Sequence, residues 1–152
     1  MKELNGIKYI ERLPAVKSDA TPLFVLIHGY GSNEEDLFSF AQDLPPHAHI
    51  VSVRARYDLV YGGYAWYDIN FVNNEKWMDE EQAIESRNKL VEFIDTIVQQ
   101  EKLDDKNVTL MGFSQGAILS YAISLNHPEK IKNVAILSGY PEHKIIGKID
   151  AS

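Results

Sequence analysis

The five residues Gly112-Phe113-Ser114-Gln115-Gly116 have the types and spacing needed for nucleophilic chemistry. They follow an apolar run at residues 108–111 and precede a helix-like stretch from Ala117 to Asn126. In a GxSxG turn between a strand and a helix, the small residues let the backbones pass and the serine hydroxyl stands clear above the sheet edge. Free amides at the helix start then face negative charge on a substrate oxygen. This context predicts that Ser114 is a nucleophile.

A second glycine-rich turn, His28-Gly29-Tyr30-Gly31, directly follows the apolar run at residues 23–27. Acyl transfer creates an oxyanion, which is usually held by the amide after the nucleophile and by another amide from a loop after an earlier strand. We therefore expect the amides of Tyr30 and Gln115 to form this oxyanion hole, with Gly29 among the substrate-binding residues. Either turn alone is also compatible with an ordinary strand-to-helix connection.

Both turns lie within a longer resemblance, from about residue 6 to residue 140. The chain resembles the phospholipase/carboxylesterase family of α/β-hydrolases, which includes acyl-protein thioesterases and small bacterial carboxylesterases. A local departure is Arg56, where family members often carry proline. The segments that carry the resemblance are Leu26-Ile27-His28-Gly29-Tyr30-Gly31-Ser32-Asn33-Glu34-Glu35-Asp36-Leu37, Gly63-Tyr64-Ala65-Trp66-Tyr67-Asp68, Gly112-Phe113-Ser114-Gln115-Gly116-Ala117 and Leu137-Ser138-Gly139-Tyr140.

The resemblance also implies partners for Ser114 that this sequence lacks. Family members continue past the Leu137-Ser138-Gly139 strand to an aspartate and then to a Gly-His pair, and the order of such triads is serine, acid, histidine. This chain ends at Ser152, and neither His127 nor His143 has the expected sequence setting. We therefore expect residues 1–152 to form a single α/β-hydrolase domain that is incomplete at its C-terminus.

Composition narrows the class of protein. The 152 residues are 45% hydrophobic and 24% charged, enough for one buried core and too few for two ordinary domains. The formal net charge of −7 with scattered basic residues argues against nucleic acid as a partner. There is no cysteine and no long apolar run, so we expect no thiolate metal site, no stable membrane insertion and a cytoplasmic location.

Apolar strands alternate with helical patterns along the chain. Ser32 with Glu35 predicts a capped helix to about Leu44, and Asp79 with Gln82 predicts another to about Glu101. Alternation of this kind predicts an α/β-hydrolase-type parallel sheet with helices on both faces, here lacking the last strands and helices. The predicted strands span residues 7–13, 23–27, 49–53, 108–111 and 133–138.

The segment from Val60 to Val72 is rich in Tyr, Trp and Gly and has no clear periodicity. It either folds over the carboxyl edge of the sheet as part of an acyl pocket or packs its aromatic side chains under a long loop. The resemblance favours the pocket and places Trp66 among the substrate-binding residues. We expect His28 to shape its turn by a hydrogen bond and expect His47 and His49 to bind no metal, because no third ligand converges on them.

We therefore expect a serine hydrolase of carboxylic esters or thioesters that needs no metal and no cofactor, and that is inactive or weakly active as this chain. The alternative is a catalytically dead fragment or pseudoenzyme that binds an acyl ligand or a partner chain in the same cleft. The final strand, residues 133–138, is apolar on both faces and leaves an open edge. We expect either a companion segment or a homo-oligomer at that edge.

Overall fold

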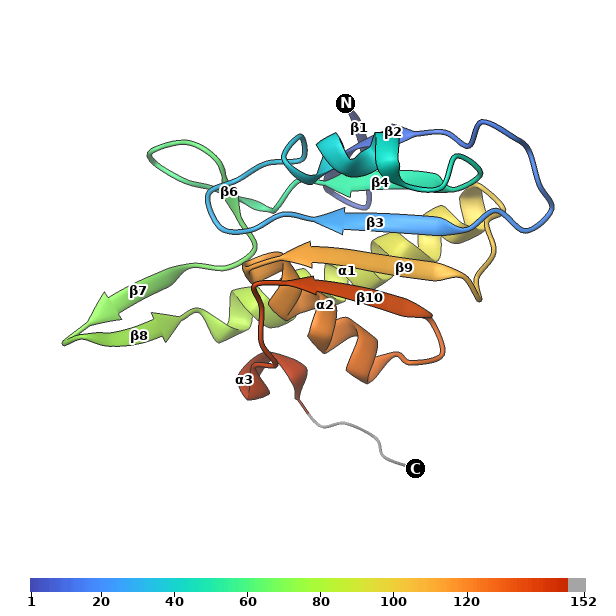
Figure 1. The fold of residues 1–152 in the computed structure, drawn as a ribbon. Helices are drawn as coiled ribbons and strands as arrows, with labels where there is room; N and C mark the ends of the chain where they lie inside the picture. The colour runs from blue at the N-terminus through green and yellow to red at the C-terminus, as the bar shows by residue number, and fades with distance from the viewer. Residues whose placement is uncertain (148–152) are drawn as a thin grey trace.

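The computed structural model describes the backbone of residues 1–147 and the side chains of all of these except Phe71 and Val72. Within this range a central sheet is combined with helices (Figure 1). The strands are β1 (Lys2–Leu4), β2 (Ile7–Arg12), β3 (Leu23–Ile27), β4 (His49–Val53), β5 (Tyr57–Asp58), β6 (Tyr64–Ala65), β7 (Ile69–Val72), β8 (Glu75–Met78), β9 (Val108–Phe113) and β10 (Asn133–Leu137). The helices are the 3₁₀-helix η1 (Leu37–Asp43) and the α-helices α1 (Glu80–Gln100), α2 (Gln115–Asn126) and α3 (His143–Ile146).

The main sheet has six strands in the order β1-β2-β4-β3-β9-β10. The pairs from β4 to β10 are parallel, as expected, but β1 with β2 and β2 with β4 are antiparallel. The predicted α/β-hydrolase-type sheet is therefore confirmed in its central and C-terminal strands, and the N-terminal strands β1 and β2 add antiparallel pairs that make the sheet mixed. The β1–β2 pair follows from the tight turn at Asn5 and Gly6, whose φ angles of 52° and 78° suit a two-residue hairpin.

Alternating side chains of the central strands point to two separate clusters. On one face Leu23, Val25 and Ile27 of β3 pack in the larger core that includes residues of α1 and α2. On the other face Leu26 lies in a smaller cluster with Leu37 and Ala41 of η1. Helices thus lie on both faces, as predicted, and Figure 1 shows α1 and α2 together on one side of the sheet.

The two predicted helix starts have different outcomes. Asp79 caps α1, because its side chain accepts a hydrogen bond from the Gln82 amide at 3.0 Å. The predicted cap at Ser32 is wrong. The Ser32 hydroxyl bonds instead to Asp36, and the Glu35 amide donates to the side chain of Asn33, which holds a local turn. The helix that follows starts only at Leu37 and is a 3₁₀-helix.

The segment between β4 and α1 forms two small hairpins, β5 with β6 and β7 with β8. Tyr64 of β6 also pairs with Ser32 and Gly31, so this segment is joined to the turn that follows β3. In Figure 1 the β7–β8 hairpin extends away from the sheet at the ends of the arrows β3 and β9. The segment therefore lies at the edge of the sheet where the two glycine-rich turns also occur.

Candidate active site

Ser114 lies at the sharp corner between β9 and α2. Its φ of 53° and ψ of −112° place a residue other than glycine in the left-handed half of backbone space, so the backbone is strained at this corner. The Ser114 amide donates to the Leu137 carbonyl at 2.8 Å, and its carbonyl accepts from Ile118 at 3.0 Å. These bonds hold the corner between the end of β10 and the first turn of α2.

The glycines of the corner are required by close backbone contact. A Cβ built at Gly116 would lie 2.6 Å from the His28 carbonyl oxygen and closer still to that of Ile27. A Cβ at Gly112 would lie 2.5 Å from the Ser120 hydroxyl. Any side chain at either position would therefore push α2 away from the sheet.

The two glycine-rich turns meet at Ser114. A Cβ at Gly29 would lie 3.2 Å from the Ser114 Cβ and 3.1 Å from the Phe113 carbonyl oxygen. Tyr30 follows directly and is partly exposed, and Gln115 begins α2. No hydrogen bond from the amide of Tyr30 or of Gln115 is observed among residues 1–147. The oxyanion hole formed by these two amides stays a prediction.

His28 is buried and shapes the first turn, as expected. Its Nε2 accepts a hydrogen bond from the Ala55 amide at 3.0 Å, so the proton of the neutral ring is on Nδ1, which donates to the Gly29 carbonyl at 2.7 Å. Burial lowers the pKa of His28 below its ordinary value of 6.5. The ring therefore stays neutral near pH 7, with both nitrogens occupied by the backbone.

The side chain of Gln115 has a role that the sequence analysis missed. Its Oε1 accepts from the Trp66 amide and its Nε2 donates to the Tyr67 carbonyl, both at 2.7 Å. The Ser86 hydroxyl of α1 binds the Trp66 carbonyl at 2.6 Å. The corner at residues 112–116, the elbow, is thereby held to the segment between β4 and α1. The sequence pattern cannot predict these two hydrogen bonds, because they join residues that are 49 and 48 positions apart.

Trp66 is fully buried, and its indole Nε1 donates to the His28 carbonyl at 2.9 Å. Its ring lies beside that of His28, with the centroids 5.7 Å apart. The indole thus stabilises the turn at residues 28–31, which favours the second expectation for this segment, aromatic packing under a loop. Direct contact of Trp66 with substrate stays a prediction.

Three further titratable side chains, those of His49, His127 and Glu142, have partners other than Ser114. His49 is buried, and its Nε2 lies 2.7 Å from Glu11. His127 lies 3.6 Å from Glu129. Glu142 accepts the Lys144 amide at the start of α3, beside His143. Within residues 1–147, no histidine forms a hydrogen bond with Ser114, and no group of three His, Asp or Glu side chains could hold a metal ion.

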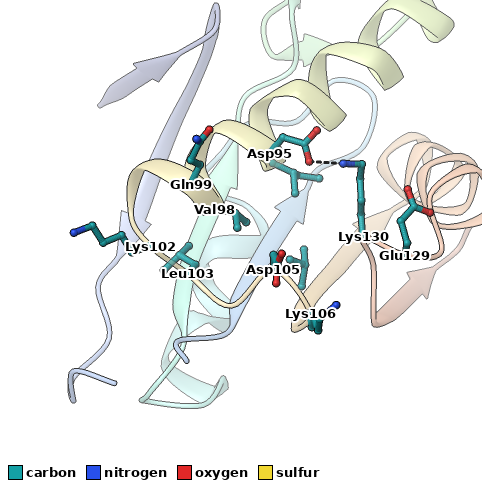
Figure 2. Close-up of a pocket in the computed structure, with 11 residues that line it drawn as sticks. Asp95, Val98, Gln99, Lys102, Leu103, Asp105, Lys106, Glu129 and Lys130 are labelled. Carbon is teal, nitrogen blue, oxygen red and sulfur yellow. Dashed lines mark hydrogen bonds and ion pairs between the residues drawn. The ribbon is translucent and has the colours of Figure 1, made fainter. Parts of the chain in front are cut away.

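A cavity of about 610 Å³ lies at the opposite end of the sheet. It is lined by the C-terminal part of α1 and by Val108, which begins β9, whereas Ser114 follows the end of that strand. Figure 2 shows acidic and basic side chains around it, with Lys130 and Asp95 joined by an ion pair of 2.8 Å. This mixed charge and the distance from the elbow separate the cavity from the candidate site.

The fold and the strained elbow define an α/β-hydrolase. Residues 10–147 match the Phospholipase/Carboxylesterase family, and the chain belongs to that family. It is similar to the putative hydrolase MhqD of Bacillus subtilis, with 24% identity over 79% of this chain and 58% of the relative. Acyl-protein thioesterase 1 homolog 1 of Dictyostelium discoideum is 34% identical over 52% of this chain and 37% of that protein.

Solved structures of esterases share the fold. A carboxylesterase from Mesorhizobium loti superimposes with a TM-score of 0.77 at 22% identity and covers 93% of this chain. Esterase PE8 gives a TM-score of 0.74 at 28% identity and covers 89% of this chain. This chain spans 64% and 65% of those two structures and 58% of MhqD. Separately, the helices within residues 1–147 include none that is both long and apolar enough to cross a bilayer.

Proposed function

We propose that Ser114 is the nucleophile of a hydrolase acting on carboxylic esters or thioesters. The observation that carries the proposal is the close approach of Gly29 to the strained Ser114 corner, where a Cβ built on Gly29 would lie 3.2 Å from the Ser114 Cβ. A reacting carbonyl beside the Ser114 hydroxyl would have the Tyr30 and Gln115 amides as donors for its oxygen. Family membership supports the reaction class. A cytoplasmic location is part of the same proposal.

In this scheme the Ser114 oxygen attacks the carbonyl carbon, and the amides of Tyr30 and Gln115 hold the negative charge of the tetrahedral intermediate. The leaving alcohol or thiol departs, and water then releases the acyl group from the serine. Both steps need a base that accepts a proton. Because no histidine within residues 1–147 is hydrogen-bonded to Ser114, we propose that this chain alone is weakly active.

The lack of a histidine hydrogen-bonded to Ser114 within residues 1–147 also favours a second candidate function. In it, the chain is catalytically dead and binds an acyl ligand or a partner polypeptide through the region around Ser114. The two candidates differ in whether Ser114 can form an acyl ester at all. A dead chain would bind an acyl compound without transferring its acyl group to Ser114.

Hydrolysis of p-nitrophenyl acetate tests the proposal. Without a base, the wild-type chain retains only the contribution of binding and the oxyanion hole, roughly 10³- to 10⁴-fold over water after loss of triad members. We expect Ser114→Ala to change this low rate little. Added imidazole supplies the missing base, so it should raise the rate of the wild type above that of Ser114→Ala. Mass spectrometry should then detect an acetyl group on Ser114.

Ser124→Ala is the matched control, because Ser124 lies on α2 and its hydroxyl donates to the Tyr121 carbonyl of the same helix. This variant should respond to imidazole like the wild type. If the increments with imidazole are equal in the wild type and Ser114→Ala, Ser114 is not the nucleophile and the second candidate is favoured. Strong serine-dependent turnover without imidazole would contradict the weak activity that we propose.

A further inference from the structure

A small cavity where β4 ends is lined mainly by cationic side chains. Its volume is about 190 Å³, and the residues around it include Gly6, Lys8, Arg54, Arg56, Asp58 and Tyr64. Three of these residues carry a positive charge and one a negative charge, whereas the whole chain has a formal net charge of −7. All of the walls come from residues 6–64, on the side of the sheet away from β10. The cavity is therefore a local exception to the acidic character of the chain.

Lys8 and Arg54 lie opposite each other on neighbouring antiparallel segments. Tyr9 of β2 pairs with Val53 of β4, and the Arg54 amide donates to the Lys8 carbonyl at 2.8 Å, so the pairing continues for one more residue. Side chains at directly opposed positions share a face of the sheet, and like charges placed there repel each other. Among residues 1–147, the exposed Lys8 ammonium has no ion pair that would offset this repulsion.

Glu34 engages only part of the Arg54 guanidinium. The Glu34 carboxylate accepts from Nε at 2.8 Å and from Nη2 at 2.6 Å. The guanidinium also lies over the ring of Tyr64, 4.5 Å from its centre. These contacts fix the orientation of the group, while its Nη1 forms no hydrogen bond with the described part of the chain. Arg54 thus presents a pre-oriented donor at the cavity.

Arg56 also has donors without an acceptor. Its Nη2 donates to Glu85 of α1 at 3.0 Å, and its guanidinium lies over the Tyr57 ring. Its Nη1 is buried and has no hydrogen-bond partner within residues 1–147. Buried polar groups are nearly always hydrogen-bonded, and a charged one is costly to leave unpaired. The orphaned nitrogen therefore indicates that an acceptor belongs near this side chain.

We propose that this cavity binds a phosphate group. A phosphate carries up to two negative charges and several acceptor oxygens, which suits donors from three side chains. The volume of about 190 Å³ is below the roughly 300–1,000 Å³ of pockets for drug-sized ligands, so one compact group fits better than a large molecule. The phosphate would lie between Lys8 and Arg54, relieve their repulsion and supply the acceptor that Arg56 lacks. Free phosphate and the phosphate of a monoester share this chemistry.

The walls of the cavity are joined to the turn at residues 28–31. Tyr64 accepts a backbone hydrogen bond from Gly31 and donates one to Ser32, both at 2.9 Å. The Ala55 amide donates to the Nε2 of His28 at 3.0 Å. A bound phosphate would therefore stabilise the segments that hold this turn. The proposal does not depend on the proposed hydrolysis, because it rests on the cavity and is tested by binding rather than by activity.

Isothermal titration calorimetry with sodium phosphate tests the site, with sodium acetate at the same pH and ionic strength as the control anion. We expect phosphate to bind at one site per chain and acetate to bind much more weakly. Lys8→Gln and Arg56→Gln should each weaken phosphate binding by about tenfold, which is typical for the loss of a charged hydrogen bond. Asp58→Asn removes the opposing carboxylate, so it should tighten binding by up to about fivefold.

Lys132→Gln is the matched control, because it removes the same charge from an exposed lysine at the other end of the sheet. This variant should bind phosphate like the wild type, and a urea transition shows whether each variant is folded. Amide chemical shifts locate the site: phosphate should move the signals of Lys8 and Arg56 more than those of β10. Glycerol 3-phosphate distinguishes the two sources, since tighter binding than inorganic phosphate assigns the site to a monoester and weaker binding assigns it to free phosphate.

Three outcomes would overturn the proposal. The first is the absence of saturable phosphate binding in both the calorimetric and the chemical-shift titrations. The second is acetate binding as tight as phosphate binding, because the cavity would then attract any anion. The third is an equal effect of Lys132→Gln and Lys8→Gln, because phosphate would then respond to the overall charge of the chain rather than to this cavity.

Discussion

Replacing Gln115 with methionine tests how the elbow is held to the segment between β4 and α1. Methionine keeps the length and the apolar stem but can neither accept from the Trp66 amide nor donate to the Tyr67 carbonyl. Each buried backbone group left without a partner costs about 1–3 kcal/mol, so Gln115→Met should lower the free energy of unfolding by about 2–6 kcal/mol. This is a substantial part of the roughly 5–15 kcal/mol of a typical domain.

The control is Gln82→Met on α1. The Gln82 side chain also accepts a backbone amide, that of Asp68 at 2.8 Å, but this bond is exposed. Water replaces an exposed bond, so the loss should be about 0.5–1.5 kcal/mol. Urea titration gives both free energies, and hydrogen exchange at the Trp66 amide reports the local effect. If Gln115→Met costs no more than Gln82→Met, the side-chain hydrogen bonds of Gln115 do not stabilise the site as argued.

The remaining predictions concern the glycine corner and the buried histidine. Gly116→Ala should destabilise the chain by about 3 kcal/mol or more, because its Cβ would overlap the Ile27 carbonyl. Gly6→Ala has open space around its Cβ and should cost only the backbone strain of about 1–2 kcal/mol. Equal losses in urea titration would contradict the packing argument. Because the folded pKa of His28 lies below 6.5, the unfolded chain binds the proton first, so stability is complete above pH 6.5 and falls below it. His28→Gln should weaken this dependence in urea titrations on either side of pH 6.5, and an unchanged dependence would show that another group causes it.

The strands and long helices could be predicted from the sequence because their signals are local. Asp79 with Gln82 marks the start of α1, and the apolar run before Gly112 marks β9. The antiparallel start of the sheet was missed, although Asn5-Gly6 is a strong two-residue hairpin signal. The Ser32 cap failed because Asn33 competes with it for the local amides.

The candidate site was predictable only in part. The glycine spacings locate Ser114 and the turn at Gly29, since close backbone approach excludes other residues there. The residues that hold the two turns in place were not predictable, because the hydrogen bonds of the Gln115 side chain and the burial of Trp66 depend on contacts between distant segments. Short strands such as β5 and β6 were missed for a related reason: two residues carry too little periodicity to indicate a strand.

The order of strands also has a consequence for folding during synthesis. β3 pairs with β4 and with β9, and Leu23 is matched with Val108, which follows it by 108 − 23 = 85 positions. The Ser114 corner needs both β3 and β9, so it cannot form until the ribosome has released residues 108–113. Until then one side of the apolar β3 lacks its neighbour, and closing so long a loop is slow. We therefore expect the corner to be among the last parts of the chain to form and the nascent chain to be open to aggregation or chaperone binding before that step.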